Sequence, residues 1–75
     1  MPLNYKLATK IAKNYGFECI RQNWSHQQFS NGKDIVTIPH KKEFPTGTGR
    51  AIIKDIAKKY WIDYKEIIAK YKIKF

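Results

Sequence analysis

The chain has 75 residues and a formal net charge of +9 at pH 7. A chain of this length has room for one compact core, which excludes a second domain and disfavours a deep small-molecule site. Basic residues occur along the whole chain, so we expect the folded body to carry a positive field that attracts polyanions such as nucleic acid. Lysines that serve only solubility are the alternative interpretation.

The first predicted element is an amphipathic helix that Asn4 caps and Gly16 ends. One face of this helix is apolar and carries Leu7, Ala8, Ile11, Ala12 and Tyr15. The opposite face carries Lys6, Lys10 and Lys13, which form either a solvated surface or a track for phosphates.

Three strands are predicted next, from the segments FECIRQN, SHQQFS and KDIVTI. The first connection is very short and lies near Trp24, and the second contains Asn31-Gly32, which favours a type I′ hairpin turn. Pro39 ends the third strand. Cys19, the single cysteine, is expected to be a small buried residue of the first strand. The strands therefore predict an antiparallel sheet in chain order.

Alternation along the second strand predicts where its histidine points. Phe29 is its one large apolar residue and should face the helices, together with Ser25 and Gln27. His26 then points to the open face of the sheet, either as an idle solvated side chain or as a group that transfers protons. In the third strand, Val36 and Ile38 are the predicted inward pair.

The rest of the chain predicts a loop and two helices. The loop from Pro39 to Gly49 contains Lys41-Lys42, and Thr46 or Thr48 is expected to cap the second helix. The second helix carries apolar residues at the spacing of the first: Ile52, Ile53, Ile56, Ala57 and Tyr60. Asp63 and Glu66 indicate a capping box for a last helix, whose apolar residues are Tyr64, Ile67, Ile68 and Tyr71.

These elements predict an α+β fold, a three-stranded antiparallel sheet with helices on one face. Their α-β-β-β-α order is that of double-stranded-RNA-binding domains, here with an extra C-terminal helix. We expect residues 1–75 to form a single domain, with a core over about 5–60 and a C-terminal helical extension over 61–75.

The segments GFECIRQNWSHQQFS, DIVTIPHKK and GTGRAIIKDI, in this order, resemble the HicA family of toxin ribonucleases. The matching features are Gly16-Phe17, Arg21-Gln22, Ser25-His26, Pro39-His40, and Gly47-Thr48 with Arg50, within residues 7–57. The resemblance implies cleavage of mRNA by one histidine on the second strand, which is His26 by position, and neutralisation by a HicB-like antitoxin. The family usually has glycine where this chain has Trp24, which either obstructs the substrate or offers a base a stacking surface.

Ribonuclease chemistry needs proton transfer and positive charge. A histidine, with an ordinary pKa of about 6.5, suits the first role, and cations stabilise the charge on the phosphate. The candidate RNA-binding residues are Lys41, Lys42, Arg50, Lys6, Lys10, Lys13, Trp24 and His40. His40 is either a second proton carrier or an exposed loop residue.

We expect a cytoplasmic protein that uses no metal and no cofactor and has no membrane partner. The six carboxylates are scattered along the chain, whereas a two-metal mechanism needs them clustered. Two other functions remain open: a non-catalytic RNA-binding module of the same fold, and an interaction protein whose open sheet face docks an acidic partner. Loss of cleavage on replacing His26 distinguishes the ribonuclease from the non-catalytic RNA-binding module. Salt-dependent RNA binding distinguishes both of these from the interaction protein.

Overall fold

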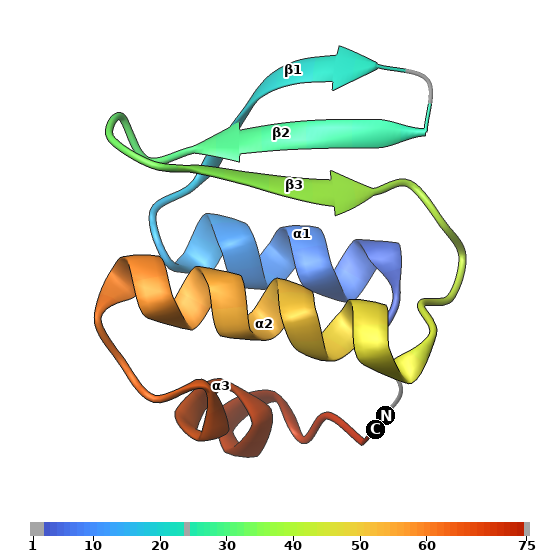
Figure 1. The fold of residues 1–75 in the computed structure, drawn as a ribbon, viewed down its shortest axis with the longest axis vertical. Helices are drawn as coiled ribbons and strands as arrows, with labels where there is room; N and C mark the ends of the chain where they lie inside the picture. The colour runs from blue at the N-terminus through green and yellow to red at the C-terminus, as the bar shows by residue number, and fades with distance from the viewer. Residues whose placement is uncertain (1–2, 24, 75) are drawn as a thin grey trace.

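The computed structural model describes residues 3–23 and 25–74, which form a three-stranded antiparallel sheet and three helices (Figure 1). The elements, in chain order, are α1 (Tyr5–Asn14), β1 (Glu18–Asn23), β2 (His26–Ser30), β3 (Ile35–Pro39), α2 (Thr46–Tyr60) and α3 (Tyr64–Tyr71). The strands lie in the order β1-β2-β3. This arrangement confirms the predicted α+β fold with an additional C-terminal helix.

Helix α1 begins and ends where the sequence predicts. The Asn4 side chain accepts a hydrogen bond of 2.9 Å from the backbone N–H of Leu7. At the other end, Gly16 has a positive φ of 86°, and the N–H groups of Gly16 and Phe17 donate to the carbonyls of Lys13 and Ala12. This pair of bonds is a Schellman motif, which needs a residue that tolerates the left-handed region.

The sheet buries alternate residues of β2 and β3. Phe29 pairs with Val36, and Gln27 pairs with Ile38, and all four side chains are buried. The predicted inward positions of Gln27, Phe29, Val36 and Ile38 are therefore confirmed.

Strand β1 is exposed along its whole length. Cys19 pairs with Phe29, but it is exposed, so the expectation of a buried cysteine was wrong. The physical reason is the position of β1 at the edge of the sheet, farthest from the helices in Figure 1, where no helix covers it. The register shifts between Cys19 and Arg21, which leaves Ile20 as the extra residue of a bulge.

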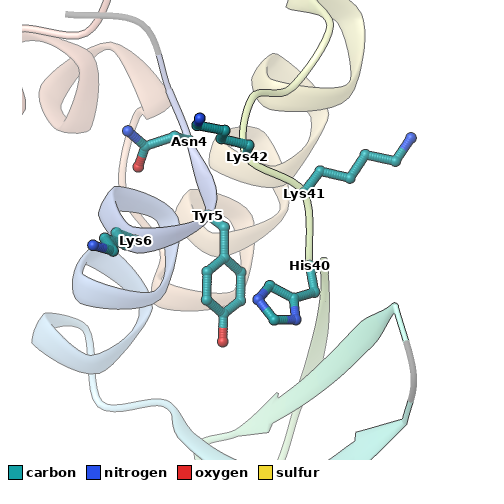
Figure 2. Close-up of a pocket in the computed structure, with 6 residues that line it drawn as sticks. All are labelled: Asn4, Tyr5, Lys6, His40, Lys41 and Lys42. Atoms are coloured by element: carbon teal, nitrogen blue, oxygen red, sulfur yellow. The ribbon is translucent and has the colours of Figure 1, made fainter.

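The helices lie on one side of the sheet. Helices α1 and α2 both contact β3 and run in the same direction, and α3 packs on α2 away from the sheet (Figure 1). The first turn of α1 lies beside residues 40–42, which follow β3 (Figure 2). The core between these layers consists largely of aliphatic residues from all three helices, and Phe17 and Phe29 are its largest members.

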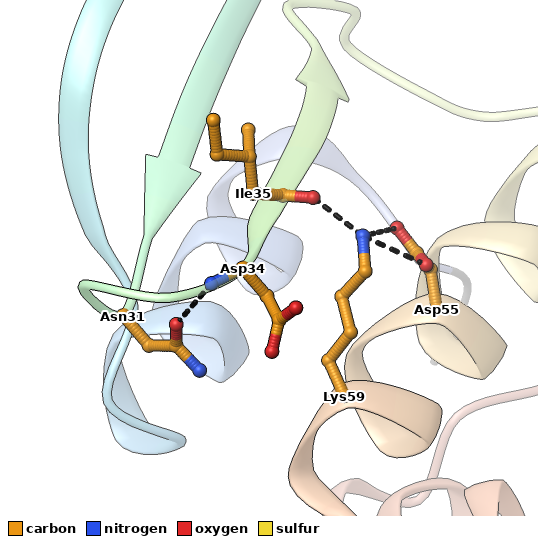
Figure 3. Close-up of polar contacts among 5 residues, drawn as sticks. All are labelled: Asn31, Asp34, Ile35, Asp55 and Lys59. Atoms are coloured by element: carbon orange, nitrogen blue, oxygen red, sulfur yellow. Dashed lines mark hydrogen bonds and ion pairs between the residues drawn. The ribbon is translucent and has the colours of Figure 1, made fainter.

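The connection from β2 to β3 differs from the predicted type I′ turn. Gly32 has a positive φ of 92° and Asn31 does not, although a type I′ turn needs both. Instead, the side-chain oxygen Oδ1 of Asn31 accepts a hydrogen bond of 2.9 Å from the N–H of Lys33 and one of 2.6 Å from the N–H of Asp34. Figure 3 shows the bond from Asp34. Residues 31–34 thus form a longer loop around an asparagine turn.

Lys59 ties this hairpin to α2. Its ammonium donates to the backbone carbonyl of Ile35 and lies 3.2 Å from the carboxylate of Asp55, one turn earlier in the helix (Figure 3). The contact fixes one end of β3 against the C-terminal half of α2.

Helix α2 begins at Thr46, earlier than the predicted loop allowed. Pro45 is its N-cap and gives no side-chain hydrogen bond, so the expected cap by Thr46 or Thr48 was wrong. Thr46 and Thr48 are the first and third residues of the helix, so neither occupies the N-cap position from which a hydroxyl caps the first turn.

Helix α3 belongs to the same hydrophobic core as the rest of the chain. The Asp63 carboxylate accepts from the N–H of Lys65, and Ile67 and Ile73 are buried. Tyr15 meets Tyr60 edge-on at 4.8 Å between ring centroids. Burial raises the pKa of the Tyr15 hydroxyl, and the nearby Tyr71 and Glu66 of α3 raise it further. The C-terminal ends of α1 and α2 therefore lie beside α3.

The asparagine turn makes a testable prediction. Asn31→Ala removes the oxygen that holds two backbone N–H groups, so we expect a loss of about 1 kcal/mol in unfolding free energy and about 5 °C in Tm. Asn31→Asp keeps an acceptor at the same place and should stay near the parent. Thermal unfolding followed by circular dichroism measures both, and equal stability of the two variants would contradict this account of the turn.

Candidate functional site

His26 is the first residue of β2 and is exposed. It pairs with Asn23 of β1 on one side and with Pro39 of β3 on the other. Because its neighbour Gln27 is buried on the helix side, the pleat directs His26 to the open face of the sheet. This is the placement that the sequence predicts.

The side chain of Ser25 is engaged with His26. Its Oγ lies 3.1 Å from His26 Nδ1, within hydrogen-bonding distance. Ser25 is exposed in the connection between β1 and β2, so the prediction that it points inward with Gln27 was wrong. The strand begins only at His26, so the alternation of faces does not extend back to Ser25.

His40 continues the β2–β3 ladder by one residue beyond the end of β3. Its backbone N–H donates to the carbonyl of Ser25 at 2.6 Å. The backbones of His26 and His40 are therefore close together in space, at the same end of the sheet. Pro39 lies opposite His26, so the two residues are on the same face of the sheet. Because faces alternate along a strand, His40, the next residue, is on the helix side.

The ring of His40 packs against Tyr5, the first residue of α1. The ring centroids are 4.2 Å apart and the planes are tilted by 38° (Figure 2). His40 is exposed, whereas Tyr5 is partly buried and packs on the hydrophobic core. His40 is thus exposed, as expected of a loop residue, but its ring is held in place by Tyr5.

A cavity of about 430 Å³ lies beside this ring pair, and three lysines contribute to its wall. Its lining residues are Asn4, Tyr5, Lys6, His40, Lys41 and Lys42. The Lys41 side chain extends away from the two rings in Figure 2, while Lys6 and Lys42 lie on the side of α1. None of the lining residues is acidic, so the surroundings favour an anion.

The structure brings together some of the predicted RNA-binding residues and separates others. Lys6, His40, Lys41 and Lys42 share the cavity, whereas Lys13 lies in the last turn of α1, beside Gly16 and Cys19. Lys10 and Arg50 are exposed on α1 and α2 respectively. Trp24 lies outside the described residues.

Tyr5 is the site residue that sequence reasoning missed. It precedes Ala8 by three residues and Ala12 by seven, so the spacing of the apolar face already includes it. That spacing identifies Tyr5 as a packing residue, but it gives no indication that His40, distant in the sequence, is its partner.

Within residues 3–23 and 25–74, no three side chains of His, Cys, Asp or Glu come together as metal ligands do. In the same part of the chain, no helix has the length and apolar character needed to cross a membrane.

The chain matches a protein-family model. The model of the HicA toxin of bacterial toxin–antitoxin systems matches residues 6–57, which is more than half of the chain. The chain belongs to the HicA toxin family. Both histidines of this HicA-family toxin lie within the matched segment, while α3 lies beyond it. Searches of curated proteins and of solved structures gave no match.

The contact between Tyr5 and His40 can be tested directly by NMR. Because the two rings are in contact, Tyr5→Leu removes a ring current and should move the His40 ring resonances. The His26 resonances should stay in place, since its ring lies near Ser25 and on the other face of the sheet. A spectrum in which both histidines keep their positions would contradict the described packing.

Proposed function

We propose that this HicA-family toxin is an endoribonuclease that cleaves mRNA without a metal, with His26 as the group that transfers protons. The observation that carries the proposal is the position of His26. It is an exposed imidazole on the open face of a basic protein, at the same end of the sheet as the lysine-lined cavity on the helix side. The family resemblance assigns the catalytic role to the same position.

The proposed reaction uses the 2′-hydroxyl of the RNA as nucleophile. His26 takes the proton from this hydroxyl as the 2′-oxygen forms a bond to phosphorus and the bond to the 5′-oxygen breaks. The resulting imidazolium then supplies a proton to the departing 5′-oxygen, directly or through water. The products are a 2′,3′-cyclic phosphate and a 5′-hydroxyl, and no other reactant is needed.

Ser25 gives the imidazole a defined orientation in this proposal. With Nδ1 placed 3.1 Å from Ser25 Oγ, Nε2 is the ring nitrogen that meets the substrate. A general base works well only when its proton-accepting atom is held within hydrogen-bonding reach of the substrate. We therefore assign Ser25 a positioning role rather than a nucleophilic one.

The lysines supply the charge that holds the phosphates. Lys41 and Lys42 are exposed in the loop that follows β3, close to the end of the sheet that carries His26. Arg50 on α2 and the lysines of α1, Lys6, Lys10 and Lys13, extend the basic surface over two helices. Such contacts fix the backbone of a nucleic acid without reading its sequence.

We further propose that a HicB-like antitoxin neutralises the toxin by covering His26, and that both act in the cytoplasm, where mRNA is found. A protein of net charge +9 favours an inhibitor with an acidic surface, because opposite potentials speed association and fix orientation. In this proposal residues 1–75 act as one domain, in which α3 extends the segment shared with the family.

Replacing His26 tests the proposal. We expect His26→Ala to slow cleavage of a labelled RNA by roughly 10²- to 10⁴-fold in buffer with a chelator, because it removes the only proposed proton carrier. Its affinity for RNA should stay near that of the parent. The matched control is Gln28→Ala, which alters the same face of the same strand and should cut at the parent rate.

Two outcomes would contradict the proposal. Undiminished cleavage by His26→Ala would remove the histidine from the mechanism. Salt-dependent RNA binding by a parent protein that never cuts RNA would favour the non-catalytic RNA-binding module instead.

A further inference from the structure

We propose that the cavity between α1 and the segment after β3 is a nucleotide subsite, in which the Tyr5–His40 ring pair stacks an RNA base and lysines hold the adjoining phosphate. This inference rests on the proposed RNA substrate, but it concerns a different surface from His26. It assigns a role to Tyr5, which the resemblance to the family does not mention.

The ring pair has the form of a stacking platform. Tyr5 is partly buried on the hydrophobic core and supports His40, whose own ring is exposed, with 4.2 Å between the centroids. Single-stranded RNA is commonly recognised by stacking its bases on tyrosine and histidine rings, which loses little conformational entropy when the rings are already held. The contact with Tyr5 holds the His40 ring in this way before any ligand binds.

The size and charge of the cavity fit a nucleotide. Its volume of about 430 Å³ lies in the range of sites that take small organic ligands. Its lining combines the aromatic residues Tyr5 and His40 with Lys6 and Lys42 (Figure 2). A base needs the rings and a phosphate needs the ammonium groups, so one nucleotide satisfies both parts.

The backbone connects this cavity with the proposed cleavage site. The N–H of His40 donates to the carbonyl of Ser25, and the side chain of Ser25 contacts His26. The cavity and His26 therefore lie at the same end of the sheet, so an RNA strand that presents one phosphodiester to His26 can pass round this end to the cavity. The subsite would hold a nucleotide next to the bond that is cut, and would set its position along the strand.

The test measures binding of uncleavable RNA. The ligand is a 2′-O-methylated single strand of about eight nucleotides, a length within the range that small domains bind. The reference ligand is a sugar–phosphate strand of equal length without bases. Fluorescence anisotropy gives the affinity of each protein variant for both strands.

We expect Tyr5→Leu and His40→Leu each to weaken binding of the strand with bases by roughly 5- to 100-fold, and to leave binding of the abasic strand near the parent value. Tyr5→Phe keeps the ring and should bind both strands as the parent does. Tyr60→Leu is the matched control, because it removes a half-exposed tyrosine at the far end of the helices.

The lysines should behave differently from the rings. Lys42→Gln is expected to weaken binding of both strands and to reduce the slope of log affinity against log salt by about 0.7, the value for one phosphate contact on a single strand. Lys65→Gln, on α3, should leave the slope unchanged.

Parent-like affinity of both Tyr5→Leu and His40→Leu for the strand with bases would overturn the subsite, and so would an equal loss on both strands, which indicates a structural effect. His40→Leu keeps the test decisive if Tyr5→Leu fails to fold, because His40 is exposed. None of these results depends on cleavage, so failure of the subsite is distinct from failure of the His26 mechanism.

Discussion

The register between β2 and β3 is the constraint on which the candidate site depends. Phe29 opposite Val36 and Gln27 opposite Ile38 form the inward face of the sheet. Because side chains alternate between the two faces, this pairing directs His26 to the open face and places His40 on the helix side. A slip of one residue would exchange the two faces and bury the imidazole. The hydrophobic residues that stabilise the sheet therefore also decide on which face of the sheet each histidine lies.

The same end of the fold gathers groups from distant parts of the chain. The start of β2, the end of β3 and the N-terminal ends of α1 and α2 lie together on one side of the molecule (Figure 1). Helix N-termini carry partial positive charge, and the lysines of the cavity add full charges there. In our account, one histidine at this end transfers protons and the other helps to hold the RNA strand, so a protein with one small core needs no deep pocket.

Local patterns in the sequence were sufficient to predict the elements and the face of His26. The apolar spacing of α1 with its Asn4 cap, and the alternation around Phe29, each depend on residues close in sequence. Tertiary position decided the features that the sequence did not predict. Cys19 is exposed because β1 lies at the sheet edge, and Tyr5 meets His40 across the fold. No local pattern contains the information that these contacts need.

The central claim is that the RNA supplies its own nucleophile and His26 only moves protons. The most direct measurement compares cleavage of an RNA with cleavage of the same strand carrying a 2′-deoxy sugar at the cut nucleotide, in buffer with a chelator. The account predicts that the RNA yields a 2′,3′-cyclic phosphate and a 5′-hydroxyl, and that the substituted strand stays intact at that position. Cleavage of the substituted strand there, or products with 5′-phosphates, would contradict it.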